Sequence, residues 1–147
     1  MEHFMKQIGS EKTSFVTIVA SGIRSSYPHG EASEKVIELG DMVILDFGAT
    51  FHGYASDVTR TVALGEPHPR LAEFYDLVLE AELAGVNAIR HGIKSKELDS
   101  IIRSPFVREN VHDRFNHGAG HNIGLDIHEA PYISYRSEHT SLLRIWS

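Results

Sequence analysis

The sequence predicts an α+β domain, because strand-type and helix-type segments occupy separate stretches of the 147 residues. Residues 14–64 contain β-branched and alternating runs, whereas residues 70–104 carry apolar positions at helical spacing. A chain of this length can bury about 70% of the surface that it exposes when unfolded. We therefore expect residues 1–147 to form one domain with its own core.

The strand-type segments come first along the chain. Residues 14–21, SFVTIVAS, are β-branched and partly alternating, which is typical of a strand. Residues 22–34 are rich in Ser, Gly and Pro and predict a loop that contains His29. The runs MVILDFGATF and YASDVTRTVAL flank the dipeptide His52-Gly53, which predicts a β-hairpin with a two-residue turn.

The predicted hairpin brings two carboxylates to one face. If its turn is His52-Gly53, Asp46 lies opposite Thr59, and side-chain alternation puts Asp57 diagonal to Asp46 on the same face. Asp is depleted in strands, and two neighbouring carboxylates repel each other unless a cation or a proton lies between them. We therefore give equal weight to two interpretations of the pair, a functional site and two ordinary exposed strand residues.

The helix-type segments follow. Residues 70–90 form a broad apolar stripe and predict a first helix. A second helix is expected to begin after Ser95 as its cap, and Pro105 is expected to kink or stop it because proline lacks the N–H donor. Residues 115–131, FNHGAGHNIGLDIHEAP, contain three glycines that disfavour a helix, and they predict a loop and then a strand closed by Pro131.

The composition excludes several classes of function. Without cysteine there is no disulfide, thiolate metal site or cysteine nucleophile, so any metal must be bound by His, Asp or Glu. The net charge of -6 and the lack of a basic cluster argue against nucleic acid as a partner. No signal-peptide core or membrane-length apolar run occurs, which predicts a cytoplasmic protein with no membrane partner. Nucleotide-binding, zincin and serine-hydrolase motifs are missing as well.

Four of the ten histidines are candidate functional residues. His117, His121 and His128 lie among glycines that let the backbone bring imidazole rings to a shared pocket, and His29 lies in a Gly/Pro loop. Carboxylates with imidazoles suit Mn, Co, Fe or Zn ions, which activate a water for hydrolysis while histidines move protons. The other histidines are expected to be ordinary surface or core residues: His3, His52, His68, His91, His112 and His139.

Several motifs together resemble one known family. IVASG, PHGEAS, GDMVILDFGATFHGYASDVTRTVALGEP, FNHGAGHNIGLDIHEAP and YRSEHT are similar, in this order, to the Xaa-Pro dipeptidase (prolidase) and aminopeptidase P group of the methionine-aminopeptidase-like metallopeptidases. The resemblance runs from about residue 14 to residue 140, and DVTRT and HEAP favour the proline-specific branch. It implies the pita-bread fold and metal-dependent cleavage of the peptide bond before the imide nitrogen of proline.

The resemblance implies three metal ligands in this chain. Asp46 would be a chelating ligand, Asp57 a bridging ligand and His121 the third, around two Mn²⁺ or Co²⁺ ions. The family adds two glutamates, one in an EPG segment after HEAP and one in a strand reading roughly R-I-E-D, and neither motif occurs here. We therefore expect a catalytic domain that is incomplete at both ends, with one weak metal site or none and little activity.

The resemblance also implies the residues that contact substrate. His29 would lie in the substrate site, and His117 and His128 would bind substrate and stabilise or protonate the tetrahedral intermediate. The expected partners are short peptides with proline at the second position, and a homodimer is plausible because unpaired sheet edges favour association. A non-catalytic module that binds a peptide or a partner is the alternative, and a metal-free hydrolase related to creatinase is a third reading. Dipeptidase and aminopeptidase remain equal alternatives.

Overall fold

The computed structural model describes residues 1–137, and the predictions for His139 and for the end of the YRSEHT motif lie outside the described residues. The chain divides into two compact units, one made of residues 1–72 and 123–128, the other of residues 73–122 and the stretch from 129 onward. Helices and strands are both present, as the α+β class predicts. No helix among the described residues has the length and apolar character that a membrane span requires.

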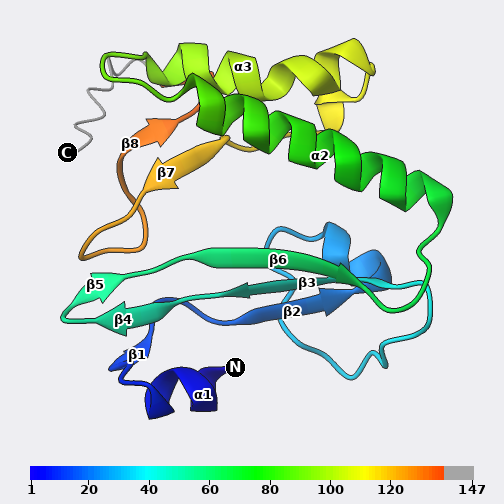
Figure 1. Ribbon diagram of the computed structural model, residues 1–147, viewed down its shortest axis with the longest axis vertical. Helices are drawn as coiled ribbons and strands as arrows, with labels where there is room; N and C mark the ends of the chain where they lie inside the picture. The colour runs from blue at the N-terminus through cyan, green and yellow to red at the C-terminus, as the bar shows by residue number, and fades with distance from the viewer. Residues whose placement is uncertain (138–147) are drawn as a thin grey trace. The chain divides into compact units, whose positions relative to one another are not determined.

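The first unit is built around a long β-hairpin, seen in Figure 1 as two arms, one of β3 and β4 and the other of β5 and β6. Its two three-stranded sheets have the orders β1-β4-β5 and β2-β3-β6. The elements are α1 (Glu2–Gln7), β1 (Lys12–Thr13), β2 (Ile18–Ser21), the 3-10 helix η1 (Gly22–Ser26), β3 (Met42–Phe47), β4 (Ala49–Phe51), β5 (Tyr54–Ala55) and β6 (Val58–Ala63).

The hairpin has the predicted turn and register. His52 and Gly53 form the turn with φ angles of 49° and 79°, the positive values that a type I′ turn requires. Asp46 pairs with Thr59, as the sequence predicts. The strand expected over residues 14–21 is shorter than predicted, because only Ile18–Ser21 pairs with β3.

The hairpin ladder is interrupted between its two sheets. The Ser56 N–H donates to the Ala49 carbonyl at 2.8 Å, but the Ala49 N–H donates to Ser56 Oγ at 2.9 Å rather than to the Ser56 carbonyl. That carbonyl accepts a bond from Ser14 Oγ at 2.6 Å. A side chain at Gly48 would put its Cβ 1.9 Å from the same carbonyl oxygen, so only glycine fits. Asp57 follows this break and lies outside both β5 and β6.

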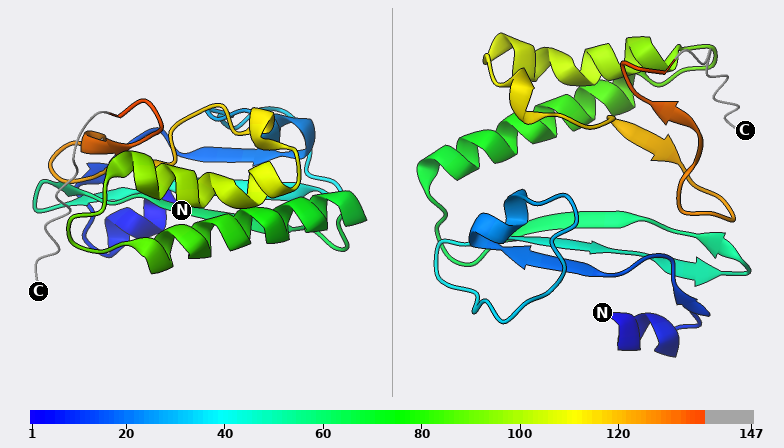
Figure 2. Two further views of the ribbon diagram at one scale, coloured as in Figure 1. Left: turned by 90° about the horizontal axis from the view of Figure 1, so that it is seen from above. Right: turned by 180° about the vertical axis from the view of Figure 1, so that it is seen from behind.

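The second unit contains two long helices and a two-stranded sheet, and the chain enters it within the first of these helices. Figures 1 and 2 show the helices side by side. They approach closely at Gly85, where a Cβ would lie 2.6 Å from Ile102 Cγ1. The elements are α2 (Pro69–Ala88), α3 (Ser95–Arg108), the 3-10 helix η2 (His112–Arg114), β7 (Gly120–Asn122) and β8 (Glu129–Ile133).

Pro105 lies inside α3, so of the two predicted effects, a kink or a stop, the stop is wrong. A proline leaves the carbonyl four residues earlier without its usual donor, and here that is the Ile101 carbonyl. Ser104 Oγ donates to this carbonyl at 2.8 Å, which replaces the missing helical bond. The predicted cap was also one residue late, because Ser95 is the first helical residue and Lys94 is the N-cap.

The last strand lies later than expected. The GLDIH segment forms a loop, and β8 begins at Glu129 and runs through Pro131 instead of ending there. The pairing of β7 with β8 has a register shift between Gly120 and Asn122, and proline is tolerated in strands at such irregularities. His121, which the sequence placed in a loop, therefore lies in strand β7.

Candidate metal and substrate site

The candidate residues are divided between the two units. The first unit contains His29, Asp46, Asp57 and His128, and the second contains His117 and His121. Among residues 1–137, no three His, Asp or Glu side chains form a group arranged to hold a metal ion. Each unit thus has its own subset of the predicted site residues.

Asp46 is held in place by its strand and by its cross-strand neighbour. The residue is half-buried in β3, directly opposite Thr59 in β6. Thr59 Oγ1 donates a hydrogen bond of 2.9 Å to Asp46 Oδ1. Carboxylates that bind metals are commonly oriented by such a bond from a neighbouring residue. The sequence predicted the pairing of these two residues but not the hydrogen bond.

Asp57 is exposed and lies in the break between β5 and β6. Its neighbour Val58 pairs with Phe47, so the register of β6 begins one residue after Asp57. Strict alternation of side chains holds only within a continuous strand. The shared face of Asp46 and Asp57 therefore stays a prediction.

His128 lies at the edge of a cavity in the first unit. The segment 123–128 is attached to β5 by a hydrogen bond of 2.8 Å from the Ala55 N–H to the Gly124 carbonyl. His128 is exposed and lines a cavity of about 500 Å³ together with charged residues that include Lys12 and Asp126. The cavity is large enough to receive a small ligand, and it places an imidazole among charged groups.

His29 is exposed in a tight turn that follows η1. The Gly30 N–H donates to the Tyr27 carbonyl at 3.2 Å, and Arg24 Nη2 donates to the Glu31 carbonyl at 2.9 Å. These bonds fix the backbone on both sides of His29 and present its ring to solvent. The predicted loop is therefore ordered by backbone contacts rather than by burial of the histidine.

His121 has the hydrogen-bonding pattern of a metal ligand. The residue is half-buried in β7, and its Nδ1 lies 3.1 Å from the Asn122 carbonyl oxygen. A carbonyl oxygen only accepts, so Nδ1 carries the proton and the ring lone pair lies on Nε2. Histidines that bind metals typically donate their other N–H to a backbone carbonyl or a carboxylate. The donor chemistry of His121 therefore fits a divalent ion.

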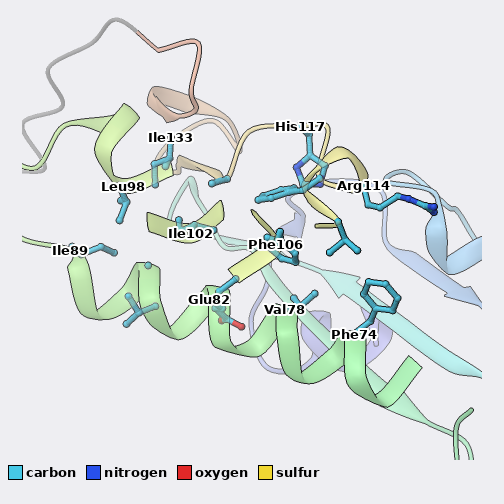
Figure 3. Close-up of a pocket in the computed structure, with 16 residues that line it drawn as sticks. Phe74, Val78, Glu82, Ile89, Leu98, Ile102, Phe106, Arg114, His117 and Ile133 are labelled. Atoms are coloured by element: carbon cyan, nitrogen blue, oxygen red, sulfur yellow. The ribbon is translucent and has the colours of Figure 1, made fainter. Parts of the chain in front are cut away.

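His117 is exposed in the loop before β7, and two contacts orient its ring. Its Nδ1 lies 2.8 Å from the Gly118 carbonyl, and its ring meets the Phe115 ring edge-on with centroids 4.7 Å apart. His117 also lines a largely apolar cavity of about 590 Å³. Figure 3 shows side chains of α2 and α3, among them Phe74 and Ile102, around this cavity with His117.

A buried ion pair in α3 was not expected from the sequence. Asp99 is 0% exposed, and its carboxylate accepts bonds of 2.7 Å from Arg103 Nε and 3.3 Å from Arg103 Nη2. Acidic and basic residues four apart in a helix are a readable signal, but such pairs usually lie on the surface. Nothing in the sequence pattern indicated that this pair would be buried beside the histidine loop.

Comparison with known proteins shows the family of this chain. A sequence profile of metallopeptidase family M24 matches residues 1–144. The chain belongs to metallopeptidase family M24. The Xaa-Pro dipeptidase of Pyrococcus furiosus is 48% identical to this M24 chain over 138 residues, which are 94% of this chain and 40% of that protein. The family resemblance inferred from the motifs is confirmed.

Solved structures confirm the fold. The structure of an Xaa-Pro dipeptidase from Bacillus anthracis matches with a TM-score of 0.92 and 52% identity, over 95% of this chain and 39% of that chain. An X-Pro aminopeptidase from Thermotoga maritima matches with a TM-score of 0.89 and 42% identity, over 95% of this chain and 40% of that chain. This M24 chain therefore has the pita-bread fold, and it spans about two fifths of the length of the relatives that it matches.

Membership in family M24 implies a divalent metal. The donors present fit this implication, because Asp46, Asp57 and His121 offer oxygen and imidazole ligands without thiolate. The bonds from Thr59 to Asp46 and from His121 to Asn122 orient two of these donors.

Proposed function

We propose that this chain supplies Asp46, Asp57 and His121 to a divalent metal centre that hydrolyses Xaa-Pro peptide bonds. The orientation of His121 is the main support, because its Nδ1 is committed to the Asn122 carbonyl and its lone pair lies on Nε2. Similarity to an Xaa-Pro dipeptidase and to an X-Pro aminopeptidase supports the substrate class. Because the chain is similar to enzymes of both kinds, the proposal covers dipeptidase and aminopeptidase activity alike.

Each histidine has a separate part in the proposed reaction. A divalent ion held by Asp46, Asp57 and His121 would lower the pKa of a bound water and would polarise the scissile carbonyl. His117 donates its Nδ1 proton to the Gly118 carbonyl, so its Nε2 is the atom that accepts and returns a proton. His128 contacts substrate from the cavity that it lines, and His29 contacts it from the ordered turn.

Four finer points belong to the same proposal. The metal is Mn²⁺ or Co²⁺, as the family resemblance implies, and mixed carboxylate and imidazole ligands are compatible with either ion. The substrates are short peptides with proline second, the protein forms a homodimer, and it works in the cytoplasm. The metal is tested by activity assays with different ions, and the substrate length by a series of peptides. The homodimer is tested by analytical ultracentrifugation, and the location by cell fractionation.

Metal titration tests the proposed ligands. Calorimetric titration of the chain with Mn²⁺ or Co²⁺ is expected to show one weak binding event, since three of the five ligands that the family resemblance implies are present. Asp57→Ala and His121→Ala are expected to abolish it, whereas Asp113→Ala, which removes an exposed carboxylate beside Arg114, leaves it unchanged. Equal binding by Asp57→Ala and the unchanged chain would refute the assignment.

A peptide assay separates the proposed peptidase from the non-catalytic alternative. With Mn²⁺ present, the proposal expects Ala-Pro to be cleaved faster than Ala-Ala, and the EDTA-treated chain to cleave neither. His128→Ala should slow cleavage while leaving the metal titration unchanged. Saturable binding of Ala-Pro without any release of proline, seen equally with and without metal, would instead support a peptide-binding module.

A further inference from the structure

We infer that Arg103 is a positioning residue for His117, because its guanidinium anchors the loop that carries this histidine to the buried carboxylate of Asp99. The inference rests on the proposed function, in which His117 transfers a proton. Neither Arg103 nor Asp99 is a candidate metal ligand. The structure connects them to His117 through backbone hydrogen bonds and through an aromatic ring.

Asp99 is the fixed point of this connection. Its side chain is 1% exposed, and that of Arg103 is 14% exposed. The carboxylate accepts two bonds from the guanidinium, from Nε and Nη2. Two-point binding restricts the plane of the guanidinium as well as its position. The directions of the remaining N–H groups of Arg103 are therefore fixed as well.

Those N–H groups bind the histidine loop. Arg103 Nη1 donates to the Phe115 carbonyl, and Arg103 Nη2 donates to the His117 carbonyl. The two carbonyls are two residues apart, so the bonds hold both ends of a three-residue segment. The backbone that bears the His117 side chain is thus attached to α3 at a distance of 14 residues in sequence.

An aromatic contact extends the same restraint to the His117 ring. The Arg103 guanidinium lies over the Phe115 ring, 4.1 Å from its centroid, and the His117 ring meets that Phe115 ring edge-on at 4.7 Å. Phe106 contacts Phe115 from α3 with centroids 5.3 Å apart. The ring against which His117 lies is therefore held both by the cation and by the helix.

The outcome of these contacts is a defined tautomer of His117. With the loop held in place, Nδ1 lies 2.8 Å from the Gly118 carbonyl, which keeps the proton on Nδ1 and the lone pair on Nε2. Lysine cannot substitute for arginine here. Its ammonium is a single point with three donors and cannot match the planar set of contacts to a carboxylate and two carbonyls.

Histidine-ring NMR on the full chain tests the inference without any activity measurement. At about pH 8, where histidine is normally neutral, nitrogen shifts report the tautomer of each ring. The His117 signals are assigned by their loss in His117→Asn. Arg103→Lys keeps the charge beside Asp99 but removes contacts to the loop. It is expected to lower the ratio of Nδ1–H to Nε2–H tautomer at His117 by about 2- to 10-fold, the effect of losing one hydrogen bond.

Arg108→Lys is the matched control. Arg108 lies on the same helix and binds Glu80 in α2 through two bonds, at 2.7 and 2.8 Å, but has no contact with the histidine loop among those described for it. This control is expected to leave the His117 tautomer unchanged. The His121 signals should stay unchanged in both variants, because the Nδ1 of His121 is bound by Asn122 rather than by the anchored segment.

A second variant keeps the test decisive if Arg103→Lys does not fold. Asp99→Leu with Arg103→Met removes both charges together and avoids an unpaired ion in the interior. An unchanged His117 tautomer in either folded variant overturns the inference. A shifted tautomer together with normal metal titration supports it. If the unchanged chain has no peptidase activity, the proposed function is refuted. The NMR measurement of the His117 tautomer can still be made and interpreted.

Discussion

In the first unit, Asp46 is oriented by the residue directly across its own hairpin, whereas in the second unit His117 depends on an ion pair in a different element. The bond from Thr59 follows from the strand register, which is set by a two-residue turn. The bonds from Arg103 join a helix to a loop, and no regular hydrogen-bond pattern of a helix or a strand produces them. The first unit therefore positions Asp46 through the register of its own hairpin, and the second positions His117 through contacts between a helix and a loop.

This difference determines how each unit should respond to mutation. The hairpin distributes its stability over many ladder bonds and is vulnerable mainly where the ladder is interrupted, near Gly48. In the second unit, Asp99 has no exposed surface, and its carboxylate binds the arginine that holds the histidine loop. We therefore expect the largest losses from the buried ion pair and smaller losses from the hairpin.

Replacing Asp99 is expected to have the largest effect. Asp99→Ala leaves the half-buried Arg103 cation without its carboxylate, which should lower the free energy of unfolding by about 3–5 kcal/mol. Urea denaturation followed by circular dichroism measures the loss. Asp113→Ala, whose carboxylate is exposed, is the control and should not change the midpoint measurably. Equal midpoints for the two variants would show that the second unit does not depend on the ion pair.

Gly48→Ala tests the weak point of the hairpin. The new Cβ would lie 1.9 Å from the Ser56 carbonyl oxygen and 2.1 Å from Ser14 Oγ, so the backbone must move. We expect a loss of about 1–3 kcal/mol, typical of overpacking. Gly120→Ala is the control, because its Cβ would lie 3.5 Å from Ile133 Cδ1, an ordinary contact. If Gly120→Ala lowers the denaturation midpoint more than Gly48→Ala does, then close packing at Gly48 is not a steric constraint on the hairpin.

Thr59→Val tests the orientation of Asp46. Valine keeps the shape of threonine but removes the hydroxyl donor, so the Asp46 carboxylate loses its 2.9 Å bond. Mn²⁺ affinity in the calorimetric titration is expected to fall about 10-fold, as for other residues that orient metal ligands. Thr61→Val, on the same strand and face but opposite Ile44, should change affinity less. Similar effects of the two variants would argue against a specific role for Thr59.

The smallest effect is expected from acid titration of Asp41. Lys35 Nζ donates a 2.6 Å bond to Asp41 Oδ2, and this bond, with a further one from the Glu38 N–H, lowers the pKa of Asp41 below 3.8. A lowered pKa in the folded state means that the contribution to stability is present above the unfolded pKa and is lost as the pH falls through the folded pKa.

Denaturation midpoints of the unchanged chain and of Asp41→Asn measure this contribution. The variant should be the less stable of the two at about pH 6, and the difference should shrink progressively below about pH 4. Because this ion pair is partly exposed, the difference should also be smaller in high salt. A difference that stays constant down to the lowest accessible pH would show that charge is not its cause.

Much of the first unit could be predicted because its information is local. The turn His52-Gly53 and the alternation of strand residues determine the pairing of Asp46 with Thr59 without reference to distant residues. The family could also be recognised, because its motifs are contiguous and occur in order. Candidate site residues were identified by type and spacing, and their assembly around a metal stays a prediction.

The sequence by itself therefore determined the α+β class, the hairpin register and the family, and it supplied the proposal that Asp46, Asp57 and His121 are metal donors. Only the tertiary structure decided that α3 continues through Pro105, because a serine hydroxyl replaces the missing donor, and that β8 runs through Pro131 at a shift in register. Burial of Asp99 with Arg103 likewise depends on residues far apart in the chain. Local patterns cannot reveal such contacts, because burial is set by what packs against a residue and not by its neighbours in sequence.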